Sequence, residues 1–561
     1  MRPVYRVGLI LALTLTAPFC APARAAEPDA PAALISPMEA VRLAIQNRLS
    51  AKFTAASEAK KTMQGALVEY YSAPEQHLLW VDNKGVTDRG KAVMDEIAKA
   101  DDYGLRASDY VLPKPDTFDD ADSKATDWLA DAEIKISFAV LNYANDARGG
   151  RINPQRLSAN LDPSLVLPNP SEVIDSIAIR SDPAAYLRSF QPDQPQFEAL
   201  RQKLLELRGG KVERERDKSA VTIPDGPLLK MGMQHEQVAL LRTRLNVPAR
   251  SAADEGTFDA ALVEAVERFQ DAHGVLPDGM VGPGTRRLLN GQQSPPAAGS
   301  SAKIRAILVN MERWRWLPHD LGPYYVTVNI PEFMLRVVNE NKTVQSTRVV
   351  VGKPDKQTPI FSDEMQEIVF NPFWNVPTSI KVEEIRPYLR EEASWFGSGG
   401  WNTAVLQRHN LHIKYLGRDV DPAAIDWNAM DIRNFEIYQP PGPDNVLGHV
   451  KFVFPNKHDV YMHDTPQKLL FAQPVRAESH GCMRVQNPDQ LALILLKRDQ
   501  AWNEARIASA ISGGYDSHVA LRQRIPVNIT YFTLKVNEDG STSNYGDIYG
   551  HDARMAAALG L

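Results

Sequence analysis

The sequence has few cysteines, few long hydrophobic runs and no excess of positive charge. Lysine and arginine number 63 against 69 acidic residues, which gives a formal net charge of −6. A nucleic-acid-binding protein that works through a broad basic surface is therefore not expected. Apolar residues make up 43% and charged residues 24%, so a collagen-like, coiled-coil or wholly disordered chain is excluded as well. One apolar run approaches the length of a membrane span, and it lies at the extreme N-terminus.

That N-terminal run has the pattern of an export signal. Arg2 and Arg6 form a positive start, an apolar segment follows, and the letters ARA at 23–25 supply a small-residue cleavage site. Prolines interrupt the segment before about 20 apolar residues accumulate, which disfavours a retained anchor helix. We expect residues 1–25 to be a signal peptide that is cleaved after Ala25, and the rest of the chain to be exported.

Cysteine is scarce, since the chain has two and one of them would leave with the signal peptide. Cys482 then remains alone in a compartment where thiols usually pair. Because it cannot pair within the chain, it is either a buried hydrophobic residue or a working nucleophile. The residues around Cys482 distinguish a buried hydrophobic role from a nucleophilic one.

The 561 residues predict three to four domains at roughly 150 residues each. Residues 26–36 are rich in alanine and proline and are expected to be disordered. From 37 to 220 the apolar spacing is helical, with helices expected at 87–99 and 134–147. We find no catalytic constellation in this part and interpret residues 37–220 as a helical scaffold domain.

Residues 228–290 form a compact unit of amphipathic helical stretches and a glycine-rich turn. Val238, Leu241 and Leu245 fall on one helical face. The pattern A-V-x-x-F-Q-x-x-H-G-x-x-x-D-G-x-V-G-x-x-T, which starts at Ala265, resembles the three-helix peptidoglycan-binding domain family. The alternative interpretation is a helical hairpin that binds no ligand.

A polar linker rich in proline, glycine and serine occupies residues 291–302, and the periodicity changes after it. Alternating or β-branched runs predict strands, among them 325–330 and 450–454. We therefore expect residues 303–561 to be a β-rich domain. Between 379 and 445 the alternation dissolves, which predicts an insertion subdomain that covers the β core as a lid.

Cys482 lies in the stretch YMHDTPQKLLFAQPVRAESHGCMRVQNP. A free thiol is only a few per cent thiolate at neutral pH, so an acyl-transfer nucleophile needs a base or dipole nearby. His463 ends a predicted strand, whereas His480 lies two residues before Cys482 in the same turn. A histidine on a separate strand can approach the sulfur along a fixed direction, so we assign the base to His463 and keep His480 as the alternative.

The residues Ser479-His480-Gly481-Cys482 predict a turn, because glycine adopts backbone conformations that other residues resist. Consecutive main-chain N–H groups in such a turn could converge on a developing oxyanion, where one donor is typically worth about 10²-fold or more in rate.

The motif continues beyond the turn. If residues 483–485 are extended, Arg484 shares a face with Cys482 and could hold a carboxylate or orient the turn. Asn487 is followed by proline, a pattern typical of a helix start.

The spacing H-x16-H-G-C-x-R-x-x-N, from His463 to Asn487, resembles the signature of the L,D-transpeptidases, whose catalytic domain is called YkuD-type. The segments NMERWRWLP, VNIPEFMLRV, FNPFWNVP, QPPGPDNVLGHVKFVFPN and DIYGHD are similar to the large periplasmic branch called YcbB-like. One departure is His449, where arginine or lysine is expected. The resemblance implies a multi-domain α+β fold: a helical scaffold, a three-helix peptidoglycan-binding domain, and a β-rich catalytic domain with an inserted lid-like subdomain.

The resemblance also implies an acyl transfer in two steps, with no cofactor or metal. Cys482 would attack diaminopimelate in a tetrapeptide donor stem and release D-alanine, and an amine of an acceptor stem would open the thioester to give a 3→3 cross-link. His463 would move the protons, and N–H groups around His480, Gly481 and Cys482 would form the oxyanion hole. Peptidoglycan is the expected partner, other cell-wall enzymes are a candidate class, and no nucleic acid is expected.

Supporting residues are assigned by the same resemblance. The carboxylate of Asp464, or a main-chain carbonyl, would orient His463. Tyr461, Trp374 and Asn487 are candidate residues of the substrate pocket, although ordinary core packing is the alternative for both aromatic residues.

Three alternatives stay open. His463, His480 and Cys482, with or without His458, are zinc-type ligands, but the sequence has no C-x-x-C or H-E-x-x-H spacing. A wall-binding protein with an inert Cys482 is the second alternative. The third keeps the acyl-enzyme and changes the acceptor: water would make an L,D-carboxypeptidase, and a lysine amine would attach a protein to the wall.

Overall fold

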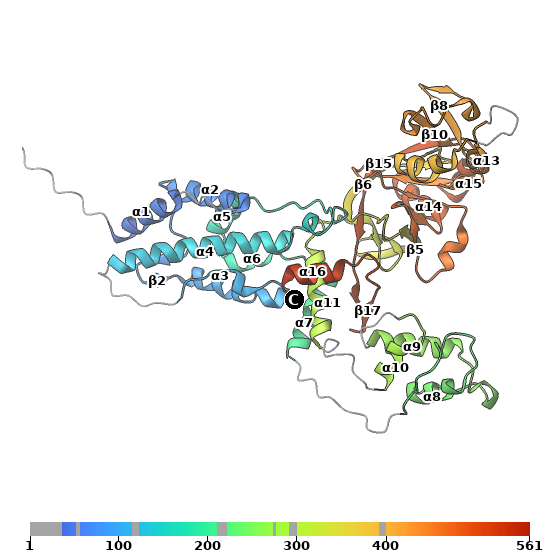
Figure 1. The fold of residues 1–561 in the computed structure, drawn as a ribbon. Helices are drawn as coiled ribbons and strands as arrows, with labels where there is room; N and C mark the ends of the chain where they lie inside the picture. The colour runs from blue at the N-terminus through green and yellow to red at the C-terminus, as the bar shows by residue number, and fades with distance from the viewer. Residues whose placement is uncertain are drawn as a thin grey trace, which may run out of the picture.

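The computed structural model describes residues 36–51, 57–114, 123–209, 221–272, 277–290, 300–391 and 400–561. The predicted signal peptide, the rest of the predicted disordered segment up to residue 35, and most of the predicted linker lie outside these ranges. None of the helices in the described ranges combines the length and the apolar composition that a bilayer span requires. The described chain forms a helical bundle, a small helical unit, and a β-rich region that carries a second, smaller sheet (Figure 1).

The helical bundle begins its helices at capping signals in the sequence. Ser36 accepts a hydrogen bond from the Glu39 N–H and precedes a proline, and Thr87 accepts one from the Gly90 N–H. Both predicted helices are confirmed, the second as part of the 27-residue α4. The elements are α1 (Pro37–Ser50), α2 (Glu58–Ser72), β1 (Val81–Asp82), β2 (Gly85–Val86), α3 (Asp88–Ala98), α4 (Ser123–Gly149), α5 (Pro170–Ile179), α6 (Pro183–Arg188) and α7 (Pro195–Gly209).

The small helical unit has its own apolar core. Its helices are α8 (Glu236–Leu245), α9 (Ala260–Ala272) and α10 (Pro283–Leu289). The buried Gln270 amide donates to Asp278 and to the Met280 carbonyl, both at 2.8 Å, and accepts from the Gly279 N–H at 3.0 Å. One glutamine of the sequence pattern therefore holds the glycine-rich turn in shape.

The β-rich region is built on a nine-stranded sheet in the order β13-β5-β14-β12-β11-β6-β15-β3-β4. Because β4 also pairs with β5, eight of these strands close into a ring around an apolar core. Helix α14 packs against its strands. The elements are β3 (Tyr324–Asn329), β4 (Met334–Asn339), β5 (Lys342–Gly352), β6 (Phe361–Phe370), β11 (Val450–Val453), β12 (Met462–His463), β13 (Ala477–Ser479), β14 (Met483–Val485), α14 (Pro488–Gln500), α15 (Glu504–Ser512) and β15 (Ser517–Thr530).

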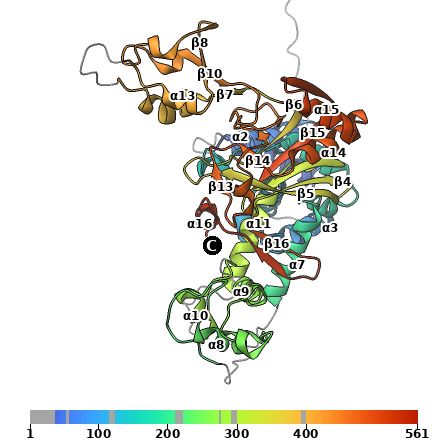
Figure 2. The same cartoon turned by 90° about the vertical axis from the view of Figure 1, so that its right-hand side faces the viewer.

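The segment predicted as an insertion contains strands that the sequence pattern did not reveal. They join β7 in a four-stranded sheet, β7-β10-β8-β9, which has an apolar core of its own. In Figure 2 this part projects from the body of the β-rich region. The elements are β7 (Trp374–Asn375), α12 (Thr378–Ile380), α13 (Ala404–Arg408), β8 (His412–Tyr415), β9 (Arg418–Asp419) and β10 (Phe435–Gln439).

One helix outside the predicted scaffold packs on its last helix, α7, and a second helix packs on the first. Helix α11 (Ser300–Trp314) begins at residue 300, so the last residues of the predicted linker 291–302 are helical. It packs on α7 and on α16 (His551–Leu559), and shares an apolar core with α7 and β16 (Leu534–Val536), which pairs with β17 (Thr542–Asn544). Apolar residues far apart in sequence share this core, a relationship that local periodicity does not carry.

Candidate active site

Two short parallel strands bring the expected nucleophile and base to one face of the sheet. The register of β12 and β14 sets His463 opposite Arg484 and therefore Tyr461 opposite Cys482. Because alternate residues of a strand point to opposite faces, these four side chains share one face. The methionines between them point into the core. His463 and Cys482 thus lie on neighbouring strands, two residues apart along the strand direction.

A main-chain carbonyl orients the imidazole of His463. Its Nδ1 lies 2.5 Å from the carbonyl oxygen of Asp464, so Nδ1 carries the proton and Nε2 is left as the acceptor. Of the two alternatives for the orienting group, the structure contains the carbonyl. The carboxylate of Asp464 instead accepts the His449 N–H at 3.0 Å and pairs with the Lys468 ammonium, so its role is to hold the adjacent turn.

Lys451 is a member of this face that the motif did not indicate. On β11 it lies opposite His463, and its ammonium lies 4.0 Å from the centre of the Tyr461 ring. The signal in the sequence is the charged residue within the apolar run HVKFVF, where Val450 and Phe452 point into the core.

The electrostatics of the face keep both reacting groups neutral. Burial, with the positive charges of Arg484 and Lys451, lowers the pKa of His463 to about 3. Burial raises the pKa of Cys482 to about 11, although hydrogen bonds from Tyr461 and the same two charges oppose the rise. A neutral imidazole on the same face as a neutral thiol is the state in which a histidine can act as the general base for a nucleophile.

The turn before Cys482 has the conformation that its glycine permits. Gly481 has a φ of +113°, and Ser479 Oγ lies 2.5 Å from the Cys482 carbonyl oxygen, to which it donates. Ser479 Oγ also accepts the Gly481 N–H at 3.2 Å, so this N–H, one of the three expected oxyanion donors, already has a partner. Among the described residues no hydrogen-bond acceptor is found for the main-chain N–H groups of His480 and Cys482.

The His480 side chain leaves the turn in another direction. Its Nε2 lies 2.6 Å from Glu384 Oε1, in the helical turn Lys381–Ile385 of the inserted part. Lys356 pairs with the neighbouring Glu383 at 2.5 Å. These two pairs connect the inserted part to the loops around Cys482, and they give His480 a partner other than the sulfur.

Arg484 is held beside the nucleophile. Its Nη1 donates to Gln467 Oε1 at 2.6 Å, while its Nε is buried without a partner among the described residues. The strand that carries it is extended, as the prediction of a face shared with Cys482 requires.

Two expected pocket residues lie elsewhere. Trp374, on β7, is partly buried and packs against the core of the inserted part, which favours the core-packing alternative. Asn487 is exposed and precedes α14 at the predicted helix start, but its side chain makes no capping hydrogen bond. Neither side chain joins the face that carries Cys482.

The ligand set of the alternative metal site does not form a cluster. His458 Nε2 pairs with Asp162 at 2.9 Å, and His480 pairs with Glu384. Within the described ranges no three His, Cys, Asp or Glu side chains gather into a group that could hold a metal ion.

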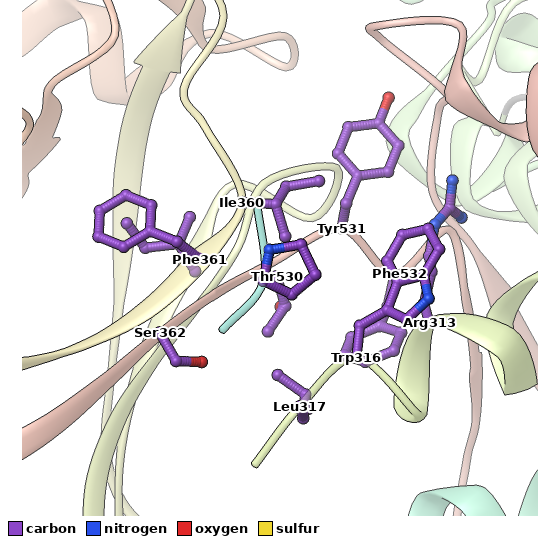
Figure 3. Close-up of a pocket in the computed structure, with 11 residues that line it drawn as sticks. Arg313, Trp316, Leu317, Ile360, Phe361, Ser362, Thr530, Tyr531 and Phe532 are labelled. Atoms are coloured by element: carbon purple, nitrogen blue, oxygen red, sulfur yellow. The ribbon is translucent and has the colours of Figure 1, made fainter. Parts of the chain in front are cut away.

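A pocket lies at the junction of α11 with the start of β6 and the end of β15 (Figure 3). Its lining is largely apolar and aromatic and includes neither Cys482 nor His463. The labelled residues are Arg313, Trp316, Leu317, Ile360, Phe361, Ser362, Thr530, Tyr531 and Phe532.

Family models match three parts of the chain. The model described as "L,D-transpeptidase catalytic domain" matches residues 323–501, the "Putative peptidoglycan binding domain" matches 234–289, and the "Scaffold domain" matches 65–204. The resemblances to the L,D-transpeptidase catalytic domain and to the peptidoglycan-binding domain family are thereby confirmed. Domains of these kinds act on peptidoglycan, which implies a location outside the cytoplasm.

Individual relatives are similar over part of the chain. A protein of Haemophilus influenzae named "Putative L,D-transpeptidase" is 32% identical over 265 residues, which are 47% of this chain and 51% of that protein. The chain therefore spans about half the length of this relative. An L,D-transpeptidase structure from Xylanimonas cellulosilytica has 12% identity and a TM-score of 0.16, and the match covers 55% of this chain and 99% of that chain. A fused Zn-dependent amidase/peptidase/peptidoglycan-binding protein from Clostridium acetobutylicum has 14% identity and a TM-score of 0.14, with 54% and 100% covered.

Proposed function

We propose that this chain, which carries an L,D-transpeptidase catalytic domain and a peptidoglycan-binding domain, forms 3→3 cross-links between diaminopimelate residues of stem peptides. The observation that carries the proposal is the shared sheet face. On this face Cys482 lies two residues along from a buried histidine of the neighbouring strand, whose Nδ1 is held by a carbonyl and whose Nε2 has no hydrogen-bond partner among the described residues.

In the first step, the Sγ of Cys482 attacks the carbonyl carbon of diaminopimelate in a donor tetrapeptide while Nε2 of His463 takes the thiol proton. The tetrahedral intermediate collapses to a thioester, and the same proton passes to the leaving amine of D-alanine. The oxyanion is negative, so the free N–H groups of the turn stabilise it most in the transition state.

In the second step, the side-chain amine of an acceptor diaminopimelate loses a proton to His463 and attacks the thioester. The new amide is the cross-link, and the thiol recovers its proton. Lys451 and Arg484 supply positive charge beside the sulfur, which favours the thiolate each time it leaves. Export to the periplasm by the N-terminal signal is part of the same proposal.

Intact-mass analysis of the full chain with a disaccharide-tetrapeptide donor, or with a carbapenem, tests the first step. We expect a covalent adduct on the wild type and none on the Cys482→Ala variant. A donor that is turned over without any adduct, or activity that a chelator abolishes, would contradict the thioester.

Muropeptide analysis of sacculi after incubation tests the acceptor. Dimers joined between two diaminopimelate residues are the expected product. Tripeptides without dimers would identify water as the acceptor, and protein attached to muropeptides would identify a lysine amine. An absence of adduct and product together would leave a wall-binding protein.

A further inference from the structure

A buried hydroxyl group contacts the turn formed by residues 479–482, which we call the catalytic turn. Thr358, whose side chain is inaccessible to solvent, donates to the main-chain carbonyl of Gly481 at 2.7 Å and accepts the Gly352 N–H at 2.9 Å. The direction of the first bond is fixed, because a carbonyl oxygen can only accept. Both hydrogen-bonding functions of this hydroxyl are therefore used, and one of them acts on the peptide that precedes the nucleophile.

That peptide carries the N–H of Cys482 itself. The described chain has no cis peptide bond, so the carbonyl of Gly481 and the N–H of Cys482 lie in one plane and point in opposite directions. A bond that holds the carbonyl on the Thr358 side therefore also aims the N–H away from Thr358. Since the Gly481 N–H is taken by Ser479, the Cys482 N–H is one of the two donors of the turn still available to an oxyanion.

The loop that presents Thr358 is held by an aromatic residue near the C-terminus. The Tyr549 hydroxyl donates to the Gly352 carbonyl at 2.7 Å and accepts the Thr358 N–H at 3.2 Å. The Tyr549 N–H in turn donates to the Tyr531 hydroxyl at 2.7 Å. These residues are all buried, so the connection from the C-terminal segment to the turn is shielded from water.

We propose that Thr358 is a positioning residue whose hydroxyl fixes the Gly481–Cys482 peptide, so that the Cys482 N–H is already aimed when the oxyanion forms. Tyr549 supports it by holding the loop of Thr358 against Gly352. The inference deepens the proposed function and rests on it. Thr358 lies within the matched catalytic domain, whereas Tyr549 lies outside residues 323–501, so the C-terminal segment contributes to the chemistry of that domain.

Two reactions of the same sulfur distinguish a loss of oxyanion stabilisation from a general loss of structure at the site. Acylation by a donor stem or a carbapenem passes through an oxyanion, whereas alkylation by iodoacetamide needs the thiolate and forms no oxyanion. In the full-length Thr358→Val variant we expect the acylation rate constant to fall about 10- to 100-fold. The alkylation rate constant should stay within about threefold of wild type. Thr358→Ser keeps the hydroxyl, so its acylation rate constant should also lie within about threefold of wild type.

A matched control is available in the neighbouring strand. Thr347 is buried on β5 and its hydroxyl has no hydrogen-bond partner among the described residues, so Thr347→Val should acylate at the wild-type rate. If Thr358→Val does not fold, Tyr549→Phe removes only one oxygen and should slow acylation severalfold with alkylation unchanged.

Wild-type acylation in Thr358→Val, or an equal loss of acylation and alkylation in it, overturns the inference while leaving the proposed function intact. A wild-type protein that is alkylated but never acylated overturns the proposed function, and the inference falls with it.

Discussion

The sulfur of Cys482 lies among groups with opposite effects on its pKa. Burial favours the neutral thiol, whereas Lys451, Arg484 and the hydrogen bonds from Tyr461 favour the thiolate, and burial wins. His463 is also neutral, so no thiolate–imidazolium pair exists at rest. The proton has to move when the substrate is attacked, which makes the direction of the His463 ring a kinetic requirement.

The rate at which iodoacetamide alkylates Cys482 should therefore follow an unusual pH profile. With a pKa of about 11, the thiolate fraction rises about tenfold per pH unit from pH 7 to 10, instead of levelling near the pKa of about 8.5 of a free thiol. Lys451→Met removes a positive charge, raises the pKa further and should slow alkylation at pH 8 by about 3- to 10-fold. Lys414→Met is the matched control, because Lys414 lies over Tyr438 in the inserted part. A plateau below pH 7 would show a preformed ion pair and contradict this description.

The two histidines of the motif should differ in the severity of their loss. His463→Ala removes the base and should lower acylation by about 10²- to 10⁴-fold, the usual contribution of general acid–base catalysis. His480→Ala removes a partly exposed pair with Glu384 and should change acylation by less than about tenfold. Single-turnover acylation with a carbapenem measures both, and equal losses would show that the base is shared or wrongly assigned.

The nucleophile and its face could be predicted from the sequence because the motif is short: Cys482 follows His480 and Gly481 directly, Arg484 comes two residues later, and His463 lies 19 residues before the cysteine. Lys451, Thr358 and Tyr549 could not: Lys451 reaches the site through its strand register with His463, and the other two reach it through hydrogen bonds across 123 and 197 positions. Trp374 packs against the core of the inserted part, and an aromatic residue next to a strand end carries no sign in the sequence of which core it joins.

At the scale of elements, the catalytic turn depends on one backbone conformation. Gly481 has a φ of +113°, and a Cβ there would meet no atom closer than the Gln357 carbonyl oxygen at 3.5 Å. The cost of a side chain at this position is therefore backbone strain rather than collision. The inserted part has a sheet and an apolar core of its own, and two ion pairs connect it to the turn and to the loop of Lys356.

Gly481→Ala should destabilise the protein by about 1–3 kcal/mol and should also slow acylation, because relief of the strain moves the Cys482 N–H. Gly417→Ala is the control: Gly417 has a φ of +77° in the inserted part, where a Cβ would meet nothing within 4 Å. It should lower the midpoint of thermal unfolding to a similar degree and leave acylation unchanged. Thermal unfolding and carbapenem acylation measured on both variants check this, and slower acylation in both would assign the effect to stability alone.

The elements of the ring and the bundle could largely be predicted, since alternation and capping residues mark their ends. The strands of the inserted part could not. Each of its strands has five residues or fewer, and strands that short carry too few alternating positions for a pattern.

At the scale of the whole molecule, the helices α8, α9 and α10 of the peptidoglycan-binding unit lie apart from the sheet that contains β5, β6 and β15 (Figure 1), and Cys482 directly precedes β14 of that sheet. Deletion of residues 228–290 should weaken binding to isolated sacculi at least about tenfold, because the main wall contact is lost, while acylation by a small donor stays within about twofold. Co-sedimentation with sacculi and single-turnover acylation measure the two effects. Loss of acylation in step with binding would mean that the unit supports the site directly.

The bundle also reaches the catalytic region through one extended segment. Leu161 forms a parallel bridge with Ile360, and the side chain of Asn160 donates to that of Gln357. Asp162 Oδ2 contacts both Lys457 and His458. A fragment cut at the borders of the matched catalytic domain would lose this brace on one side and Tyr549 on the other. Inhibitor screens run on such a fragment would therefore select compounds that fit an active site without these supporting contacts. A fragment for such assays should start before residue 160 and include α16.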